Sequence, residues 1–175
     1  MLWLSDSWEA IRDFMVLGGP VLRWIAITIF LMWVLILERL LYFRSDMKVM
    51  SEGIHKSWEE RIERRSWNAH MIRERMISQF SMATNSSIPM IQTLVALCPL
   101  LGLLGTVTGM IKVFEVMAVS GSGNVRAMAA GVSQATVPTM AGMVGALSGV
   151  LLVTLLSRRA TREVEFLEDS LTMDH

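Results

Sequence analysis

The chain has little of the chemistry on which enzymes and small disulfide-bonded domains depend. It contains one cysteine, Cys98, and three histidines. A single cysteine excludes a disulfide framework or a cysteine-based zinc site within one chain, and His55 and His70 have no partner at metal-ligand spacing. There is no nucleophile–base pair, and the glycines lie inside hydrophobic runs rather than in a phosphate-binding or dinucleotide-binding loop. We therefore predict a protein that is not an enzyme and that holds no metal or other cofactor.

Charge is scarce as well, and its two signs balance. Only 18% of the residues are Asp, Glu, Lys or Arg, and the formal net charge is zero, so the composition gives no reason to expect a nucleic-acid partner. The Arg64–Arg65 pair is interleaved with glutamates, which favours a solvated helical face over a nucleic-acid or anionic-lipid patch. Apolar residues make up 53% of the chain. This composition is typical of a membrane protein with several spans.

What the sequence has instead is long apolar runs. Crossing a hydrocarbon core of about 30 Å takes about 20 helical residues, and three stretches meet that length: residues 21–43, 93–117 and 128–156. The second run carries no charge from Leu94 to Ile111, and the third carries none from Ala127 to Ser157. We predict an all-α integral membrane protein with three transmembrane helices. Membrane lipids are therefore among its expected partners.

The remaining segments fit around these spans. Residues 1–20 are predicted to form an amphipathic helix at the membrane interface, ended by Gly18-Gly19-Pro20, with a frayed terminus as the alternative. Acidic residues replace the basic leader of a signal peptide. Basic residues concentrate in a helical segment at 44–92, so the positive-inside rule makes that segment cytoplasmic. It follows that the N-terminus and a loop at 118–127 are periplasmic, the tail at 157–175 is cytoplasmic, and the second and third helices extend into the cytoplasm.

Several shorter segments and residues also have an expected structure. Within 44–92, residues 47–65 and 69–82 are expected to form two helices that reverse around Ser66-Trp67-Asn68. The run A-T-N-S-S-I-P before the second span either breaks the helix or kinks it. Glu38 is expected to form an interfacial ion pair, with a functional role as the alternative. Lys112 and Glu115 are expected to form another, with gating of proton entry as the alternative.

Small residues mark one face of the second and third spans. Glycines recur at positions i, i+3 and i+7 in both, which keeps them within about 60° of one another on a helix. Small residues inside an apolar span are typical of helix–helix contact rather than lipid contact. The predicted helix-packing residues are Gly102, Gly105, Gly109, Gly142, Gly145 and Gly149.

The third span also carries more polar groups than a lipid-facing helix normally holds. Gln134, Thr136 and Thr139 are among them, so one side of this helix is expected to meet protein or water. For each hydroxyl the alternative is a bond to a carbonyl of its own helix, which requires no pore. Pro138 is predicted to kink the helix because it removes a backbone donor.

Two motifs carry a family resemblance. The run A-L-C-P-L-L-G-L-L-G-T-V-T-G-M-I-x-x-F, followed by G-V-S-Q-A-T-V-P-T-M-A-G-M, resembles the ExbB/TolQ/MotA family of proton-driven stator subunits, most closely its ExbB branch. The resemblance covers roughly residues 20–157. It implies a homo-oligomeric ring, expected to be a pentamer, in the bacterial inner membrane. Single-span helices of an ExbD-type partner would occupy its central channel, and work would pass to a TonB-type protein that serves outer-membrane transport of iron–siderophore complexes.

The resemblance also assigns residues. Thr106 and Thr139 match the channel threonines of the family, and Gln134 stands where many members carry a glutamate. With Thr136, these are the predicted channel-lining positions. Because there is no acid or histidine from Leu94 to Ile111 or from Ala127 to Ser157, the protonated carboxylate must come from the partner. A TolQ-like envelope-constriction motor and a passive helical channel or scaffold are the alternatives. A MotA-like role is less favoured, because the cytoplasmic segment is short.

Overall fold

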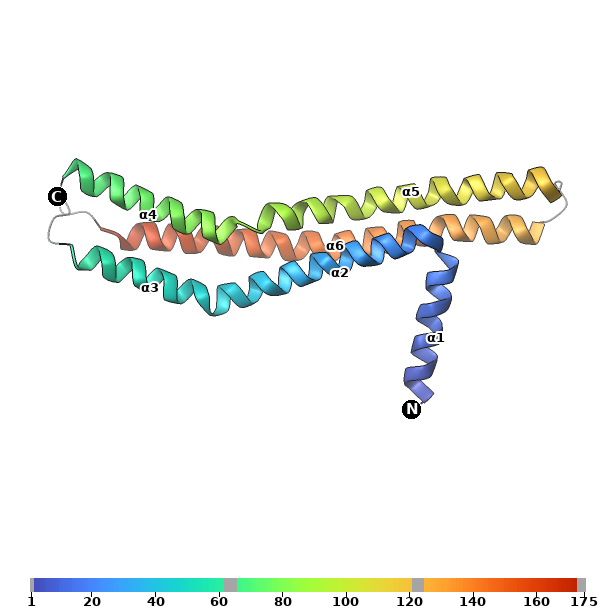
Figure 1. Ribbon diagram of the computed structural model, residues 1–175, viewed down its shortest axis with the longest axis horizontal. Helices are drawn as coiled ribbons and strands as arrows, with labels where there is room; N and C mark the ends of the chain where they lie inside the picture. The colour runs from blue at the N-terminus through green and yellow to red at the C-terminus, as the bar shows by residue number, and fades with distance from the viewer. Residues whose placement is uncertain (1, 62–65, 121–124, 173–175) are drawn as a thin grey trace. The chain divides into compact units, whose positions relative to one another are not determined.

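The computed structural model describes residues 2–61, 66–120 and 125–172, and these ranges contain helices and no strand. The expected all-α class is confirmed. Figure 1 shows the helices in chain order. They are α1 (Leu2–Leu17), α2 (Gly19–Arg44), α3 (Asp46–Glu59), α4 (Trp67–Asn85), α5 (Ile88–Ser120) and α6 (Val125–Ser170).

Three helical stretches of the described chain are long and apolar enough to cross a membrane. They lie within Gly19–Arg44, Trp67–Val119 and Val125–Ser170, and they contain the runs at 21–43, 93–117 and 128–156 from which the three spans were predicted. By helix length and composition the chain is therefore a multi-pass membrane protein.

Helix boundaries differ from the predicted ones at several points. The chain is helical through Ser120 and again from Val125, so the loop expected at 118–127 is shorter than predicted. Ala118, Val119, Val125 and Ala127 at its edges belong to the helices. The positions 121–124 at its centre, like the Arg64–Arg65 pair, lie outside the described residues. The turn at 86–87 separates α4 from α5, so the A-T-N-S-S-I-P run breaks the helix. Pro89 then falls in the first turn of α5, where a missing N–H is tolerated.

The described residues form two compact units. The first unit contains α1, the half of α2 up to Trp33, α5 from Thr93 and α6 up to Val150. In it, α5 and α6 lie side by side and run in opposite directions (Figure 1). Gly19 adopts a φ of 68° between α1 and α2, a left-handed conformation that glycine reaches at no steric cost. The backbone conformation of Gly19 therefore explains why the first helix ends at the Gly-Gly-Pro run, as expected.

The second unit contains the rest of α2, then α3, α4, the start of α5 and the end of α6. Here the last turn of α6 is capped by side chains from two other helices. The guanidinium of Arg73 on α4 donates from Nε to the Leu171 carbonyl at 2.8 Å and from Nη2 to the Glu168 carbonyl at 2.7 Å. The indole Nε1 of Trp58 on α3 donates to the Thr172 carbonyl at 3.1 Å. These side chains thus supply hydrogen bonds to backbone carbonyls at the end of α6 that no helical N–H reaches.

Arg39, next to Glu38 at the end of the first predicted span, is buried in the second unit. Its side chain is only 3% exposed, donates from Nη2 to the Ser86 hydroxyl, and lies over the Tyr42 ring, 5.0 Å from the ring centroid. Glu38 is exposed. Consecutive residues on a helix point in different directions. The sequence neighbours therefore do not pair, and Arg39 links α2 to the turn between α4 and α5.

Candidate functional site

The seam between α5 and α6 in the first unit is built from glycines. A methyl group added at Gly109 would lie 2.5 Å from the Ala135 Cα, and one added at Gly142 would lie 2.5 Å from the Cys98 carbonyl oxygen. Both distances are shorter than real Cβ contacts allow. The two helix backbones therefore approach each other as closely as glycine permits, which is how small residues act between membrane helices.

The other four predicted packing glycines are buried too. Gly102 and Gly105 face Thr139 and Pro138 of α6. Gly145 faces Ile29 of α2, and Gly149 faces Met32 of α2 together with Val95 of α5. The six glycines therefore divide between two contacts, α5 with α6 and α6 with α2. Consequently α2 covers one side of the α5–α6 pair.

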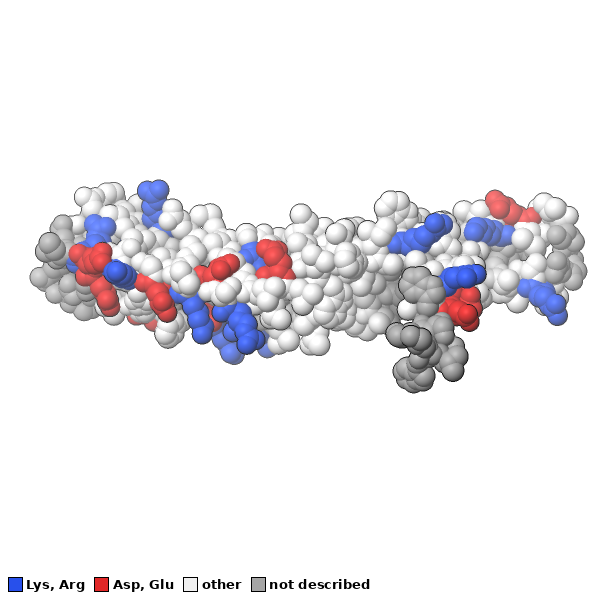
Figure 2. All heavy atoms as spheres, turned by 60° about the horizontal axis from the view of Figure 1, so that its bottom comes forward, with Lys and Arg blue, Asp and Glu red and all other residues white. Residues whose placement is uncertain are grey.

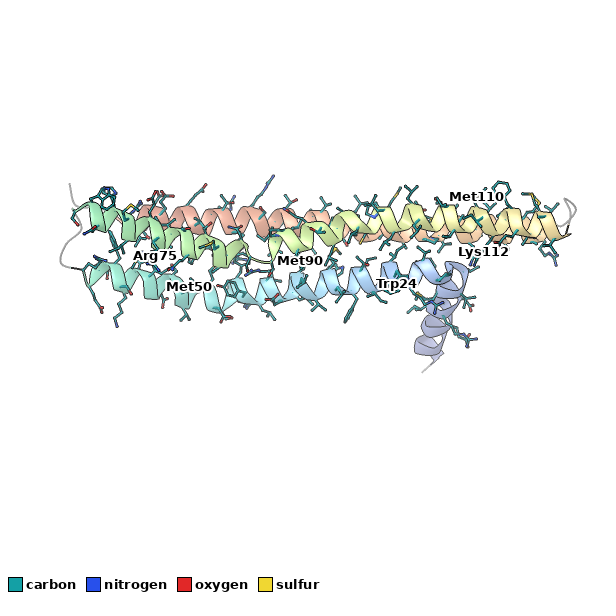
Figure 3. The ribbon with its side chains drawn as sticks, turned by 45° about the horizontal axis from the view of Figure 1, so that its top comes forward. Trp24, Met50, Arg75, Met90, Met110 and Lys112 are labelled. Atoms are coloured by element: carbon teal, nitrogen blue, oxygen red, sulfur yellow. The ribbon has the colours of Figure 1, made fainter. Side chains whose placement is uncertain are left out.

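Polar groups lie on the side covered by α2. The Lys112 Nζ is 3.4 Å from the Gln134 Oε1, which joins α5 to α6. Gln134 also packs on Gly19, where an added methyl would lie 2.7 Å from its Nε2. Figure 3 shows Lys112 beside the start of α2, with Met110 on the opposite side of α5. Among the described residues no ion pair joins Lys112 to Glu115, so the expected pair is replaced by a contact across the seam.

Two cavities adjoin the Lys112–Gln134 contact. A small one of about 20 Å³ lies against the start of α2 and is lined by Gly18, Pro20, Val21, Thr108, Gly109, Lys112 and Gln134. A larger one of about 540 Å³ also has Glu115 in its lining, together with Val16, Leu17, Val116, Ala127, Ala130 and Gly131. Lysine, glutamate and an amide therefore border a space that is large enough for water.

The threonines occupy the other side of the seam. Thr106 is two residues from Thr108, and Thr136 is two residues from Gln134, so about 200° around the helix axis separates the members of each pair. Because Thr108 and Gln134 face α2, Thr106 and Thr136 face away from it. Thr139 is three residues from Thr136, or about 60° around α6. Thr136 is exposed, whereas Thr106 and Thr139 are half-buried.

Most hydroxyls in the seam bond within their own helix. Thr106 donates to the Leu103 carbonyl at 2.7 Å, and Thr136 donates to the Ser133 carbonyl at 3.1 Å. Thr139 is different, because its hydroxyl donates across the seam to the Gly102 carbonyl at 3.0 Å. Each hydroxyl oxygen can still accept a hydrogen bond from water or from a protonated carboxyl group.

The structure thus separates residues that the sequence grouped as channel-lining. Thr106, Thr136 and Thr139 share one side, and Gln134 lies on the other with Lys112. Pro138 is buried against Gly105 within a helix that continues past it, and the kink at Pro138 stays a prediction.

The contact between Lys112 and Gln134 was not predicted from the sequence. Its only sequence signal is that both residues flank the glycine face of their helices, near the turn that joins the two spans.

The uncovered side can offer neutral hydrogen-bonding groups but no proton-carrying side chain. Neither run, from Leu94 to Ile111 or from Ala127 to Ser157, contains an acid, a lysine, an arginine or a histidine. Leu103, Met110 and Met143 are exposed around the threonines, and Ser133, one turn before Thr136, adds an exposed hydroxyl. A charge brought to this surface would therefore find the threonines and Ser133 as its polar contacts in otherwise apolar surroundings.

Comparison with known proteins places this arrangement in a family. The model of the MotA/TolQ/ExbB proton channel family matches residues 43–169, which include α5 and nearly all of α6. Two relatives from Synechocystis sp. are named as biopolymer transport proteins. ExbB-like 1 is 35% identical over 80 residues, which cover 44% of this chain and 32% of the relative. ExbB-like 3 is 28% identical over 96 residues, which cover 50% of this chain and 46% of the relative.

The chain therefore spans less than half the length of either of these relatives. The family match is longer, covers most of the chain, and contains both glycine-lined spans and the threonines between them. Its family is one of proton channels rather than of enzymes. On this match, the chain belongs to the MotA/TolQ/ExbB proton channel family.

Proposed function

We propose that this protein is the ring-forming subunit of an inner-membrane motor that couples the proton-motive force to TonB-dependent transport across the outer membrane. The observation that carries the proposal is the position of Thr106, Thr136 and Thr139 on the side of the α5–α6 pair that α2 leaves uncovered. A ring of such subunits, expected to be a pentamer, would turn these threonines toward a shared central channel. The names of the two ExbB-like relatives favour this branch over a TolQ-like role.

The proton carrier in this mechanism belongs to the partner. An ExbD-type single-span helix would bring an aspartate into the channel, because the uncovered side has no titratable group of its own. Each threonine hydroxyl donates to a backbone carbonyl in the structure, so to hold an ionised aspartate it must turn from that carbonyl and donate to the carboxylate. Protonation removes the charge of the aspartate, and the hydroxyl returns to the carbonyl. Alternation between the two states would step the central helices against the ring, and the work would leave through a TonB-type protein.

Gln134 has a different place in this mechanism from the threonines. It holds α5, α6 and the start of α2 together through Lys112 and Gly19. We therefore assign it a positioning role at the end of the spans near the α5–α6 turn. With the predicted orientation, this end is periplasmic.

The matched pair Thr106→Val and Thr108→Val tests the proposal. Both threonines lie on α5 and both donate to a carbonyl three residues earlier, Thr106 to Leu103 and Thr108 to Gly105. Only Thr106 faces the uncovered side. Each variant is co-expressed with the ExbD-type partner and reconstituted in liposomes, and proton flux is measured under an imposed gradient. TonB-dependent growth on an iron–siderophore complex provides the second measurement.

We expect Thr106→Val to lower flux and growth strongly and Thr108→Val to leave both near the wild-type level. Valine keeps the volume of threonine and removes only the hydroxyl, so both variants should assemble with the partner. Equal activity of the two variants, at equal amounts in the membrane, would refute the threonine channel. Proton flux that persists without any acid-bearing partner would instead identify a passive channel.

A further inference from the structure

A cavity in the second unit gathers basic side chains from three helices. It has a volume of about 320 Å³ and is lined by Leu40, Phe43, Arg44, Lys48 and Arg159. Arg44 is the last residue of α2, Lys48 lies in the first turns of α3, and Arg159 lies on α6. Figure 2 shows Lys and Arg side chains gathered on one face of this unit, where α2 passes into α3. Residues more than a hundred positions apart thus bring three positive charges to one cavity.

These charges are not neutralised by the protein. Among the described residues, Arg44, Lys48 and Arg159 have no carboxylate within ion-pair distance, and their side chains make no hydrogen bond. The cavity lining contains no acid. Like charges brought together repel one another, and a bound anion would reverse the sign of that interaction. The cavity therefore favours an anionic ligand.

The neighbouring cavity limits where that anion fits. It has a volume of about 290 Å³ and shares Phe43, Lys48 and Arg159 with the first cavity. The rest of its lining includes two acids and consists of Met47, Ser51, Glu52, His55, Glu163 and Phe166. Glu52 and Glu163 would repel an anion placed there. The favoured position is accordingly the side of Lys48 and Arg159 that faces Leu40, Phe43 and Arg44.

The apolar part of the lining indicates what carries the anion. Leu40 and Phe43 continue the α2 span, on which Leu37 and Leu41 are exposed, and Leu151 and Leu155 are exposed on α6. The apolar runs end at Arg44 on α2 and at Ser157 on α6, so the cavity lies where both helices leave the hydrocarbon region. A ligand with a phosphate at the membrane surface and acyl chains below it matches both the charge and this change from apolar to basic lining.

We propose that Arg44, Lys48 and Arg159 bind the phosphate of an anionic phospholipid, with its acyl chains along the apolar surface of α2. The site is independent of the proton channel, because it lies in the other unit and uses none of the threonines. Its ligand is a lipid of the bilayer rather than a soluble phosphate. The exposed leucines provide a surface for acyl chains that inorganic phosphate does not have.

The test compares two double variants with the same change of charge on the same two helices. Lys48→Gln with Arg159→Gln removes two cations from the cavity. Lys56→Gln with Arg162→Gln removes two exposed cations of α3 and α6 that line neither cavity. The purified full chain is titrated in detergent with phosphatidylglycerol, phosphatidylcholine or inorganic phosphate, and lipid retention and oligomeric state are read by native mass spectrometry.

We expect phosphatidylglycerol to bind more tightly than phosphatidylcholine, and inorganic phosphate not to compete at millimolar concentration. The cavity variant should lose affinity for phosphatidylglycerol by about fivefold for each cation, or about 25-fold in all. The control variant should bind as the wild type does. Circular dichroism of both variants tests that the helices are intact.

Three results would overturn the proposal. Equal loss of phosphatidylglycerol in both variants would mean that only overall charge matters. Competition by inorganic phosphate would identify a soluble anion as the ligand. A collapse of the oligomer in the cavity variant alone, with no preference for phosphatidylglycerol in the wild type, would mean that acidic residues of a second copy occupy the cavity.

Discussion

Replacing Gly109 by alanine tests whether α5 and α6 pack as closely as the structure has them. The added methyl would lie 2.5 Å from both Cα and Cβ of Ala135 and 2.8 Å from its backbone nitrogen. Since the obstacle is the backbone of α6 rather than a flexible side chain, the two helices must move apart. Overpacking of this kind costs about 1–3 kcal/mol, whereas alanine in place of glycine in a helix contributes about 1 kcal/mol of stability. The expected net loss is about 1 kcal/mol.

Gly53 on α3 provides the control. A methyl added there meets no atom within 4 Å, so Gly53→Ala should only gain the helix propensity of about 1 kcal/mol. The two variants should therefore differ by about 2 kcal/mol in stability. At about 2–4 °C per kcal/mol for a chain of this size, their melting temperatures should differ by about 4–8 °C.

The measurement is thermal unfolding in detergent, followed by circular dichroism at matched protein and detergent concentrations. Gly109→Ala should melt below the wild type, and Gly53→Ala should melt at or above it. A Gly109→Ala protein that gains as much stability as Gly53→Ala would refute the close approach of the helices. The division of the surface into a covered side and a threonine side would then lose its basis.

Four further substitutions have expected outcomes in the same assay. Arg73→Gln should destabilise the protein by about 2 kcal/mol, because it removes charge-assisted hydrogen bonds and a cation from the end of α6. Trp58→Phe should cost about 1 kcal/mol, because it removes one neutral hydrogen bond. A larger loss of stability for Trp58→Phe than for Arg73→Gln would contradict this ranking. Gln134→Glu should add up to about 1 kcal/mol by pairing with Lys112, and the gain should vanish in a Lys112→Met background. Gly19→Ala should cost about 1–2 kcal/mol, because its φ of 68° strains any residue with a Cβ; an unchanged melting temperature would show that the α1–α2 turn can relax.

The all-α class, the three candidate spans and the family resemblance all follow from the order of the amino acids alone. Long uncharged runs have few stable forms in a membrane other than a helix, so this inference needs only composition and length. The glycine spacing likewise predicted which face of each span carries small residues, because helical periodicity alone fixes that face. The edges of the loop predicted at 118–127 are helical instead, because alanine, which stands at both ends of that segment, favours a helix.

Which polar residues lie together depends on how the helices pack against one another. Helical spacing places Gln134 and Thr136 on different sides of α6, but which side α2 covers depends on the contacts of Gly145 with Ile29 and Gly149 with Met32. The same holds for Arg39, which stands beside Glu38 in the sequence and which the fold buries against a distant serine. Periodicity assigns residues to the faces of one helix, whereas the partner of each face is set by packing between segments far apart in the chain.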